Sequence, residues 1–421
     1  MNVAFVIPDV HLSGGIGTVV EHARRLRDDH GFDVSLVLDR DFPGQWTYDR
    51  LESVPVLPLP KAQEASYDVV VATWWETTYA LFTLESARYA YFVQSMEDRF
   101  FVPQHSPQRL GAGLTYGLPV SFITEARWIA DTLRALRPDA SCYFVRNGVD
   151  KDIFSVPDET DMRLDGPLRI LVEGRPSVWF KGVPEALAAA SRMAAPRHVT
   201  VVAADRADLP TSGYDRILGP LQQHELARVY GETDVLLKLS RIEGMFGPPL
   251  EAFHCGATCV VTPVTGHDEY VEHGWNGLLV DWDDERGTAR MLDLLAQDRR
   301  LLHFLRTNAL ATARTWPSWG QATQFMAAAL ETIRERPAAG AQASGLRLAS
   351  DFRVGIERYR LELRERDHLA LAAATLSWAP HLFHALLAKR WVRVLGRPAR
   401  PLYRRLRARL ERRMAEARYT G

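Results

Sequence analysis

The chain has 421 residues, of which 47% are hydrophobic and 24% are charged. This length and composition predict two or three globular domains, and they exclude a disulfide-stapled peptide and a globally disordered chain. The three cysteines, Cys142, Cys255 and Cys259, form no CxxC pair and lack metal-ligand spacing. We therefore expect them to be small buried side chains in a reducing compartment. The first residues lack the basic region of a secretory signal, so a cytoplasmic location is the expectation.

The formal net charge of −1 hides a polarised chain. Residues 389–418 contain twelve Lys or Arg against two Glu, a net charge of +10, which leaves −11 on the remainder. A basic segment of this density favours a polyanionic surface as its partner.

Short apolar runs alternate with helical patterns from the first residue onward, as in parallel α/β sheets. A helix is predicted over Gly17–Asp28, between the first two strands. The strands predicted in the first half are Val3–Ile7, Val34–Leu38, Val69–Ala72, Tyr91–Val93, Ser121–Thr124 and Tyr143–Val145. Those predicted in the second half are Leu168–Glu173, Val199–Ala203, Val235–Leu239, Cys259–Thr262 and Leu278–Val280.

Two similar-sized, doubly wound domains follow from this pattern, over residues 1–150 and 151–336. Parallel sheets bind ligands beyond the carboxyl ends of their strands, so two facing sheets predict a site in the cleft between them. Residues 337–345 are small and predict a linker. Residues 337–421 are then a basic helical extension.

Two glutamates eight positions apart follow the predicted strand Val235–Leu239. Glu243 and Glu251 are separated by a glycine-containing turn that leads into a helix, whose first N–H groups favour an anion. Ionised carboxylates are pure hydrogen-bond acceptors, so such a pair suits a ligand rich in hydroxyls. A solvated helix start with a favourable charge is the alternative for Glu251 taken alone.

Two cations follow the predicted strand Leu168–Glu173. Arg175 and Lys181 would lie at the carboxyl edge of the sheet, where a guanidinium fork and an ammonium suit a diphosphate. Taken as an isolated pair, they could equally be two surface cations.

Together these residues resemble the retaining family 4 glycosyltransferases of the GT-B fold. The similarity rests on GR, five residues, KG, then S-x-x-E-G and E-x7-E, in that order. It continues in Asn147-Gly148-Val149-Asp150 and in the G-x-x-E-x-V-x-x-G-x-N-G-x-L-V block from Gly266. It covers roughly residues 1 to 335. This chain departs from the usual pattern at Met245 and Phe246, because the Phe and the second Gly of E-G-F-G are displaced by one position.

The resemblance implies a nucleotide-diphosphate sugar as donor, bound mainly by the second domain. It assigns the catalytic roles to Glu243, Arg175 and Lys181, with both cations neutralising the leaving diphosphate. The donor-binding residues that it implies are Gly15, Arg175, Lys181, Leu221, Glu243, Gly244, Met245, Phe246, Gly247 and Glu251. Leu221 would lie at the base and Glu251 at the ribose hydroxyls. The reaction would retain the anomeric configuration.

The loop after the first strand, around Gly14 and Gly15, resembles the family's glycine turn beside the donor phosphates. It also reads as G-x-G-x-x-V, with Asp39 after the second strand, which is close to a dinucleotide fingerprint. Because Val20 occupies the third glycine position, an NAD-dependent oxidoreductase is the weaker alternative.

Residues 72–78 and 91–101 resemble a narrower branch, the bacterial rhamnosyltransferases of surface-layer and O-antigen rhamnan chains. Many family members carry a histidine near the position of Gln94. The candidates on the acceptor side are therefore Trp75, Gln94 and Glu97, with a place in the core as their alternative.

Two DxD strings, Asp39-Arg40-Asp41 and Asp281-Trp282-Asp283, could suggest a metal-bound diphosphate. Acidic residues are common in turns, and Arg175 and Lys181 already supply positive charge. We expect no metal site and no cofactor beyond the nucleotide sugar.

The stretch 369–388 is apolar, but it contains Pro380, His381 and His384, which argues against a membrane span. Apolar and aromatic side chains alternate with the cations of 389–418, as in a helix that lies on an anionic lipid surface. A helix pair packed on the first domain is the alternative. No nucleic-acid module is recognised.

The sequence therefore predicts a glycosyltransferase at the cytoplasmic, inner face of the plasma membrane. It would add a deoxyhexose such as rhamnose to a growing polysaccharide or lipid-linked glycan, with other glycan-assembly enzymes as further partners. A non-catalytic sugar-nucleotide-binding scaffold is the alternative from another class.

Overall fold

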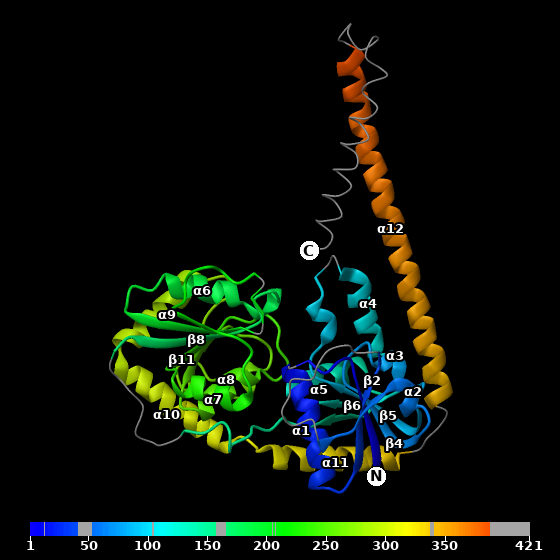
Figure 1. Cartoon of the computed structure of the whole chain (residues 1–421), viewed down its shortest axis with the longest axis horizontal. Helices are drawn as coiled ribbons and strands as arrows, with labels where there is room; N and C mark the ends of the chain where they lie inside the picture. The colour runs from blue at the N-terminus through cyan, green and yellow to red at the C-terminus, as the bar shows by residue number, and fades with distance from the viewer. Residues whose placement is uncertain are drawn as a thin grey trace. The chain divides into compact units, whose positions relative to one another are not determined.

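The structure is a computed structural model that describes residues 1–11, 13–40, 53–102, 105–156, 166–203, 205–206, 208–336 and 341–387 (Figure 1). Residues 1–356 form one compact unit, and residues 357–421 are grouped as another. The basic segment 389–418 lies outside the described residues, so the structure does not test its predicted role.

The elements of the first half are β1 Asn2–Ile7, α1 Gly14–Asp28, β2 Asp33–Leu38, β3 Val56–Pro58, α2 Leu59–Ala62, β4 Ser66–Ala72, α3 Thr78–Leu81, β5 Glu85–Val93, η2 Glu97–Phe100, α4 Ser106–Thr115, β6 Ser121–Thr124, α5 Arg127–Leu136 and β7 Cys142–Phe144. The elements that follow are β8 Leu168–Gly174, η4 Trp179–Lys181, α6 Val183–Ser191, β9 Arg197–Ala203, β10 Arg216–Leu218, α7 Gln223–Gly231, β11 Val235–Lys238, α8 Gly247–His254, β12 Thr258–Val261, η5 His267–Glu269, β13 Gly277–Leu279, α9 Glu285–Gln297, α10 Arg299–Thr315, α11 Trp319–Glu335 and α12 Ala341–Leu387.

Two parallel sheets organise the first unit, which confirms the predicted α/β class with two doubly wound domains. The first sheet has the strand order β3-β2-β1-β4-β5-β6-β7, and the second has the order β10-β9-β8-β11-β12-β13. Every strand pairing in both sheets is parallel. In each sheet the order reverses beside the first strand of the domain, which is where such folds bind ligands.

All eleven predicted strands are present, and ten of them have ends within three residues of the prediction, whereas β5 begins six residues before the predicted Tyr91. The prediction missed β3 and β10, which are the edge strands of their sheets and have three residues each. Such short runs show no periodicity, and Pro58 in β3 is tolerated only because an edge strand does not need every N–H.

Successive side chains of a strand point to opposite faces of the sheet. Both faces of the first sheet are covered, so both sets of side chains are buried. Phe5 and Ile7 pack in a cluster with α1 and α11, whereas Ala4 and Val6 belong to the core on the other face. Helices α1 and α11 lie side by side on the first face (Figure 1). Helix α11 follows the second domain in the chain, yet Met326, Leu330 and Ile333 pack on the first.

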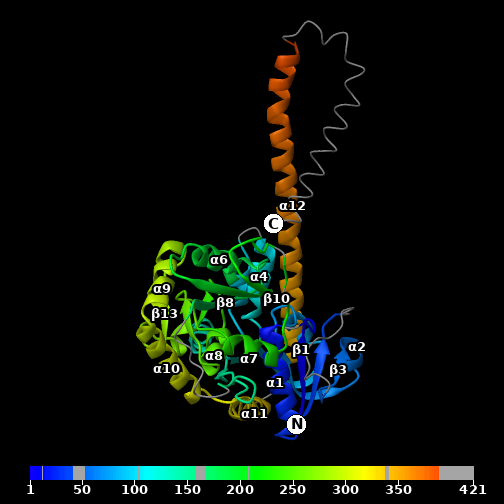
Figure 2. The ribbon, with the colours of Figure 1, turned by 60° about the vertical axis from the view of Figure 1, so that its left-hand side comes forward.

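The second sheet is covered in the same way. Ile170 and Val172 pack with α6 and α9, whereas Leu171 and Leu236 belong to the cluster that includes α7 and α8. Helices α7 and α8 are neighbours in Figure 2. Cys255 and Cys259 are buried, Cys142 is half-buried, and all three thiols are free.

Helix α12 begins at Ala341, so the linker predicted over 337–345 is shorter than expected. The first turns of α12 pack on the first domain. Gly345 is required there, because a Cβ at this position would lie 2.3 Å from the Phe82 ring. Ala349 and Ile356 are buried in the same contact. Within the described ranges, no helix is both long and apolar enough to span a bilayer.

Candidate active site

The cationic side chain of Lys181 lies at the carboxyl end of β8. Gly182 follows it with φ of 65°, and a Cβ at Gly182 would lie 2.1 Å from the carbonyl oxygen of Leu239. Only glycine fits this tight turn without strain. The Lys181 ammonium donates to both carboxylate oxygens of Glu243, with Nζ 2.9 Å from Oε1 and from Oε2. The structure thus brings together two residues that the sequence separates by sixty-two positions.

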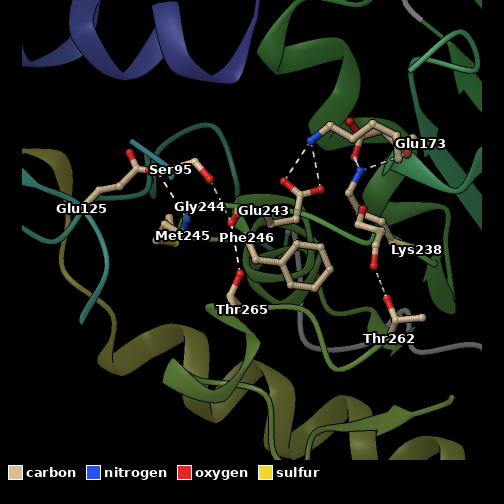
Figure 3. Close-up of polar contacts among 12 residues, drawn as sticks. Ser95, Glu125, Glu173, Lys238, Glu243, Gly244, Met245, Phe246, Thr262 and Thr265 are labelled. Atoms are coloured by element: carbon tan, nitrogen blue, oxygen red, sulfur yellow. Dashed lines mark hydrogen bonds and ion pairs between the residues drawn. The ribbon is translucent and has the colours of Figure 1, made fainter. Parts of the chain in front are cut away.

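Glu243 follows β11 and is buried (Figure 3). Burial alone would raise its pKa, but the charges of Lys181 and Lys238 and the hydrogen bonds from Lys181 outweigh burial and lower the pKa. The carboxylate is therefore ionised at neutral pH and remains a pure acceptor.

Helix α8 begins directly after this glutamate. Phe246, at its N-cap, has a left-handed backbone with φ of 59°, and its carbonyl oxygen accepts a hydrogen bond from the Tyr270 hydroxyl. Pro248 and Pro249 occupy the first turn, and proline has no N–H to donate. The helix start therefore offers fewer backbone donors than the sequence analysis expected, and the side-chain cations carry more of the positive charge. Met245 and Phe246 are buried.

Glu251 lies one helical turn further into α8. Its Oε2 is 3.5 Å from the hydroxyl of Tyr230, which is in turn 3.5 Å from Oε2 of Glu173. Burial and the nearby charge of Glu173 raise the pKa of Glu251 to about 8, against the opposing effects of Tyr230 and Lys238. Glu251 is thus mostly protonated at neutral pH, in contrast to Glu243.

Lys238, at the end of β11, was missed by the sequence analysis. Its side chain is only 2% exposed, and its Nζ lies 3.0 Å from the carbonyl oxygen of Glu173 and 3.5 Å from Oε2 of that residue (Figure 3). Charged side chains are almost never fully buried unless they are paired. A lysine inside an otherwise apolar predicted strand was the signal that could have identified it.

Two other predicted donor residues, Arg175 and Leu221, come after the strands β8 and β10 of the same sheet. Arg175 is 56% exposed, with Nε 3.6 Å from Oδ2 of Asp205, and its guanidinium is therefore open to a ligand. Leu221 is half-buried and packs on the core between the end of β10 and α7.

The loop around Gly244 touches the first domain. A Cβ at Gly244 would lie 1.9 Å from the carbonyl oxygen of Gln94, so only glycine allows this approach. Ser95 Oγ donates to the carbonyl oxygen of Glu243 at 3.4 Å, and the amide of Met245 donates to Oε1 of Glu125 at 3.3 Å (Figure 3). The carboxyl edges of both sheets therefore meet at this loop.

Glu125 was also missed by the sequence analysis. Burial raises its pKa to about 7, although Asn147 Nδ2 donates to its Oε2 at 2.6 Å and lowers that pKa. Asn147 belongs to the predicted Asn-Gly-Val-Asp motif between the domains. The motif thus helps to hold the carboxyl group that contacts Met245.

Gly15 and Gln94 lie next to each other at the carboxyl edge of the first sheet. An ideal Cβ on Gly15 would lie 3.1 Å from Oε1 of Gln94. Gly15 is in the first turn of α1, where backbone N–H groups have no intrahelical acceptor. Gln94 and the start of α1 thus lie together at the carboxyl edge of the first sheet.

Glu97 and Trp75, by contrast, lie inside the first domain. Glu97 is 1% exposed and accepts hydrogen bonds from the Trp75 amide at 2.6 Å and from the Tyr91 hydroxyl at 2.9 Å. Burial raises its pKa to about 8. Trp75 is also buried, because its ring packs against Gly111. Neither side chain faces solvent.

Among the residues that the structure describes, no group of three or more His, Cys, Asp or Glu is arranged to hold a metal ion. Of the two DxD strings, Asp41 lies outside the described residues, and Asp283 forms an ion pair with Arg241.

Residues 167–298 match the family model described as Glycosyl transferases group 1. A stretch of 87 residues is 34% identical to N-acetyl-alpha-D-glucosaminyl L-malate synthase of Bacillus anthracis. This match covers 21% of the present chain and 23% of that relative's length.

Solved structures share the two-domain fold. HepE of Anabaena, solved in complex with UDP and glucose, has a TM-score of 0.64 and 16% identity, over 79% of this chain and 100% of its own. Sucrose-phosphate synthase of Thermosynechococcus elongatus has a TM-score of 0.63 and 15% identity, over 79% of this chain and 98% of its own. WaaG, a glycosyltransferase involved in lipopolysaccharide biosynthesis, has a TM-score of 0.61 and 12% identity, over 79% of this chain and 100% of its own.

The TM-scores establish the shared fold, and the family match covers the part of the chain that carries Lys181, Glu243 and Glu251. Residues 167–298 are thus similar to the glycosyl transferases group 1, and the chain shares the two-domain GT-B fold of these solved structures.

Proposed function

We propose that this protein is a metal-independent, retaining glycosyltransferase that uses a nucleotide-diphosphate sugar. The observation that carries the proposal is the ion pair in which Lys181 Nζ lies 2.9 Å from both oxygens of Glu243. It lies where parallel sheets bind ligands, and the guanidinium of Arg175, in the same loop as Lys181, is 56% exposed. The match of residues 167–298 to glycosyl transferases group 1 supports the same reading.

The two cations bind the diphosphate. Charge accumulates on this group as the bond to the sugar breaks, and fixed cations in a partly buried site stabilise it without reorganisation. Lys181 is 28% exposed and already held by Glu243 at 2.9 Å, whereas the 56% exposed Arg175 forms a longer ion pair of 3.6 Å with Asp205. Lys181 thus supplies the preorganised charge, and Arg175 closes on the phosphate from the rim.

Glu243 accepts hydrogen bonds from hydroxyls of the transferred sugar, and the backbone from Gly244 to Gly247 binds the sugar and the distal phosphate. Glu251 binds the ribose hydroxyls, Leu221 lies at the base, and Gly15 approaches the phosphates from the first domain. The raised pKa of Glu251, about 8, gives a neutral carboxyl that can both donate to and accept from hydroxyl groups.

The transfer exchanges one bond to the anomeric carbon for another and moves one proton. The oxygen of the acceptor hydroxyl bonds to the anomeric carbon, and the bond from that carbon to the distal phosphate oxygen breaks. Its electron pair leaves on the nucleoside diphosphate, and a phosphate oxygen on the same face takes the hydroxyl proton. Attack and departure on one face retain the anomeric configuration.

The donor sugar is a deoxyhexose such as rhamnose, and the acceptor is a growing surface polysaccharide or lipid-linked glycan. Support comes from the similarity of residues 72–78 and 91–101 to rhamnan-building enzymes. HepE was solved with UDP and glucose, so UDP sugars belong in the first donor panel.

The basic segment 389–418 binds the anionic inner face of the plasma membrane from the cytoplasmic side. Its net charge of +10, interleaved with aromatic and apolar residues, supports this role. Cosedimentation of the full chain with vesicles containing anionic lipid tests it. Replacement of Arg404, Arg405, Arg407 and Arg409 by Gln should weaken binding, and unchanged binding would contradict the proposal.

The function is tested by offering UDP, GDP and dTDP sugars with a rhamnan-like acceptor to the wild type and to Glu243→Gln. We expect transfer from at least one donor and its loss in the variant. A non-catalytic scaffold predicts tight nucleotide binding with no turnover of any donor. Full activity of the variant would overturn the role given to Glu243.

A further inference from the structure

Four aromatic side chains form a continuous array that joins the two domains. Trp74 stacks on Phe100 with ring centres 5.9 Å apart and planes at 11°, and Phe100 stacks on Phe180 at 5.0 Å and 14°. Trp179 meets Phe180 edge to face at 5.6 Å. Trp74 and Phe100 follow β4 and β5 of the first sheet, whereas Trp179 and Phe180 follow β8 of the second.

The array begins at the charged cluster of the donor site. Lys181 Nζ lies 5.5 Å from the centre of the Phe180 ring and 2.9 Å from the carboxylate of Glu243. Trp179 Nε1 donates to the carbonyl oxygen of Phe100 at 3.2 Å, which fixes the outer indole relative to the first domain. A ligand on these rings would therefore lie within reach of a sugar bound at Glu243.

The rings of this array are accessible, unlike the neighbouring aromatic residues of the core. Trp179 is 46% exposed, and Trp74, Phe100 and Phe180 are partly exposed, whereas Trp75 is buried. Exposed apolar surface that is contiguous and lies beside a site marks a place of binding. Of the two adjacent tryptophans, the residue open to a ligand is Trp74 and not the predicted Trp75.

A group of polar side chains includes Glu76, which is close in the chain to Trp74 at the first-domain end of the array. Arg40 Nη2 lies 2.8 Å from Oε2 of Glu76, two residues after Trp74, and Arg40 Nε lies 3.0 Å from Oδ1 of Asp39. These partly exposed groups can exchange hydrogen bonds with hydroxyls. A pyranose ring presents one face of polarised C–H groups to the electron-rich face of an aromatic ring, and its hydroxyls project outward to such groups.

We infer that the array of Trp74, Phe100, Phe180 and Trp179 is the acceptor site, and that it binds pyranose rings at the growing end of a glycan chain. The inference rests on the proposed function, because it places the acceptor beside the donor site. Charge distinguishes the two subsites, since the diphosphate of the donor needs Lys181 and Arg175, whereas the array is neutral apart from its rim.

The test measures oligosaccharide binding independently of transfer. Rhamnose, mannose and glucose oligosaccharides are titrated calorimetrically into the full-length protein saturated with UDP. The variants are Trp179→Ala, Trp179→Tyr and Trp275→Ala. Trp275 is a matched control, because it is also 46% exposed and packs edge to face on Phe304 in the second domain. Loss of one stacking ring should weaken binding by about tenfold.

We expect Trp179→Ala to weaken binding of at least one oligosaccharide, and Trp179→Tyr and Trp275→Ala to retain it. Equal binding by Trp179→Ala and the wild type, or no oligosaccharide binding by the wild type, would overturn the inference. Hydrolysis of the donor without acceptor is measured in parallel. If Trp179→Ala lost donor hydrolysis by the same factor as oligosaccharide binding, the array would be a contact between domains. That result would also overturn the acceptor site. Absence of hydrolysis and transfer in the wild type would count against the proposed function alone.

Discussion

The carboxyl edges of the two sheets each hold a buried glutamate after a strand, but the two carboxyl groups differ in charge. Glu243, after β11, has a lowered pKa because Lys181 and Lys238 outweigh the effect of burial. Glu97, after β5, has a pKa raised to about 8 because burial dominates and its partners are the Tyr91 hydroxyl and a backbone amide. A glutamate after a strand is thus part of a charged site only where the fold brings cations to it.

The largest expected effect is on catalysis, at the ionised glutamate. Glu243→Gln removes the charge that positions Lys181 beside the donor, and we expect sugar transfer to fall by at least about 100-fold. Steady-state transfer assays measure it, and Glu232→Gln, on the exposed surface, is the control. Wild-type transfer by Glu243→Gln would remove the functional distinction between the two glutamates.

The next effect is on stability, at the buried lysine. Lys238→Met leaves Glu173 without its cation, and breaking a buried pair from one side costs about 3 to 5 kcal/mol, with the lower end expected here because Glu173 is 21% exposed. The unfolding free energy from denaturant titration should fall by about 3 kcal/mol. The double variant Glu173→Gln with Lys238→Met should recover part of this loss. Strict additivity of the two single changes would show that the pair is not coupled.

The third effect is on the pH dependence of stability, at Glu97. A carboxyl whose pKa is raised in the folded state binds more protons there than in the unfolded chain, so stability falls as pH rises from about 4.5 to about 8. Glu97→Gln cannot ionise and should make this fall shallower while transfer stays within about threefold of wild type. An unchanged slope in thermal unfolding across this range would contradict the raised pKa of Glu97.

The smallest effect is expected at the rim of the donor site. Asp205→Asn releases Arg175 from an exposed contact of 3.6 Å, and such pairs are worth at most about 1 kcal/mol. UDP affinity, measured by calorimetry, should rise by less than about fivefold. A fall in UDP affinity would contradict this expectation, because it would mean that Asp205 holds Arg175 in position for the ligand.

The fold followed from local signals because parallel strands are continuous apolar runs. Eleven strands were predicted, and only the three-residue edge strands β3 and β10 were missed. The packing of α11 on the first domain was not predicted, because a helical pattern states which face is apolar but not which sheet it covers.

The candidate site also has a part that the sequence predicted and a part that only the tertiary structure decided. Sequence patterns and the family resemblance predicted Arg175, Lys181, Glu243 and Glu251 as candidates, because these residues come after strands whose following loops gather at one edge of a parallel sheet. Only the tertiary structure decided which carboxyl groups are charged, that Lys238 pairs with Glu173, and that Trp74 is accessible while Trp75 is buried. The physical reason is that burial and charge neighbours depend on residues far apart in the chain, whereas strand and loop patterns depend on residues that are adjacent.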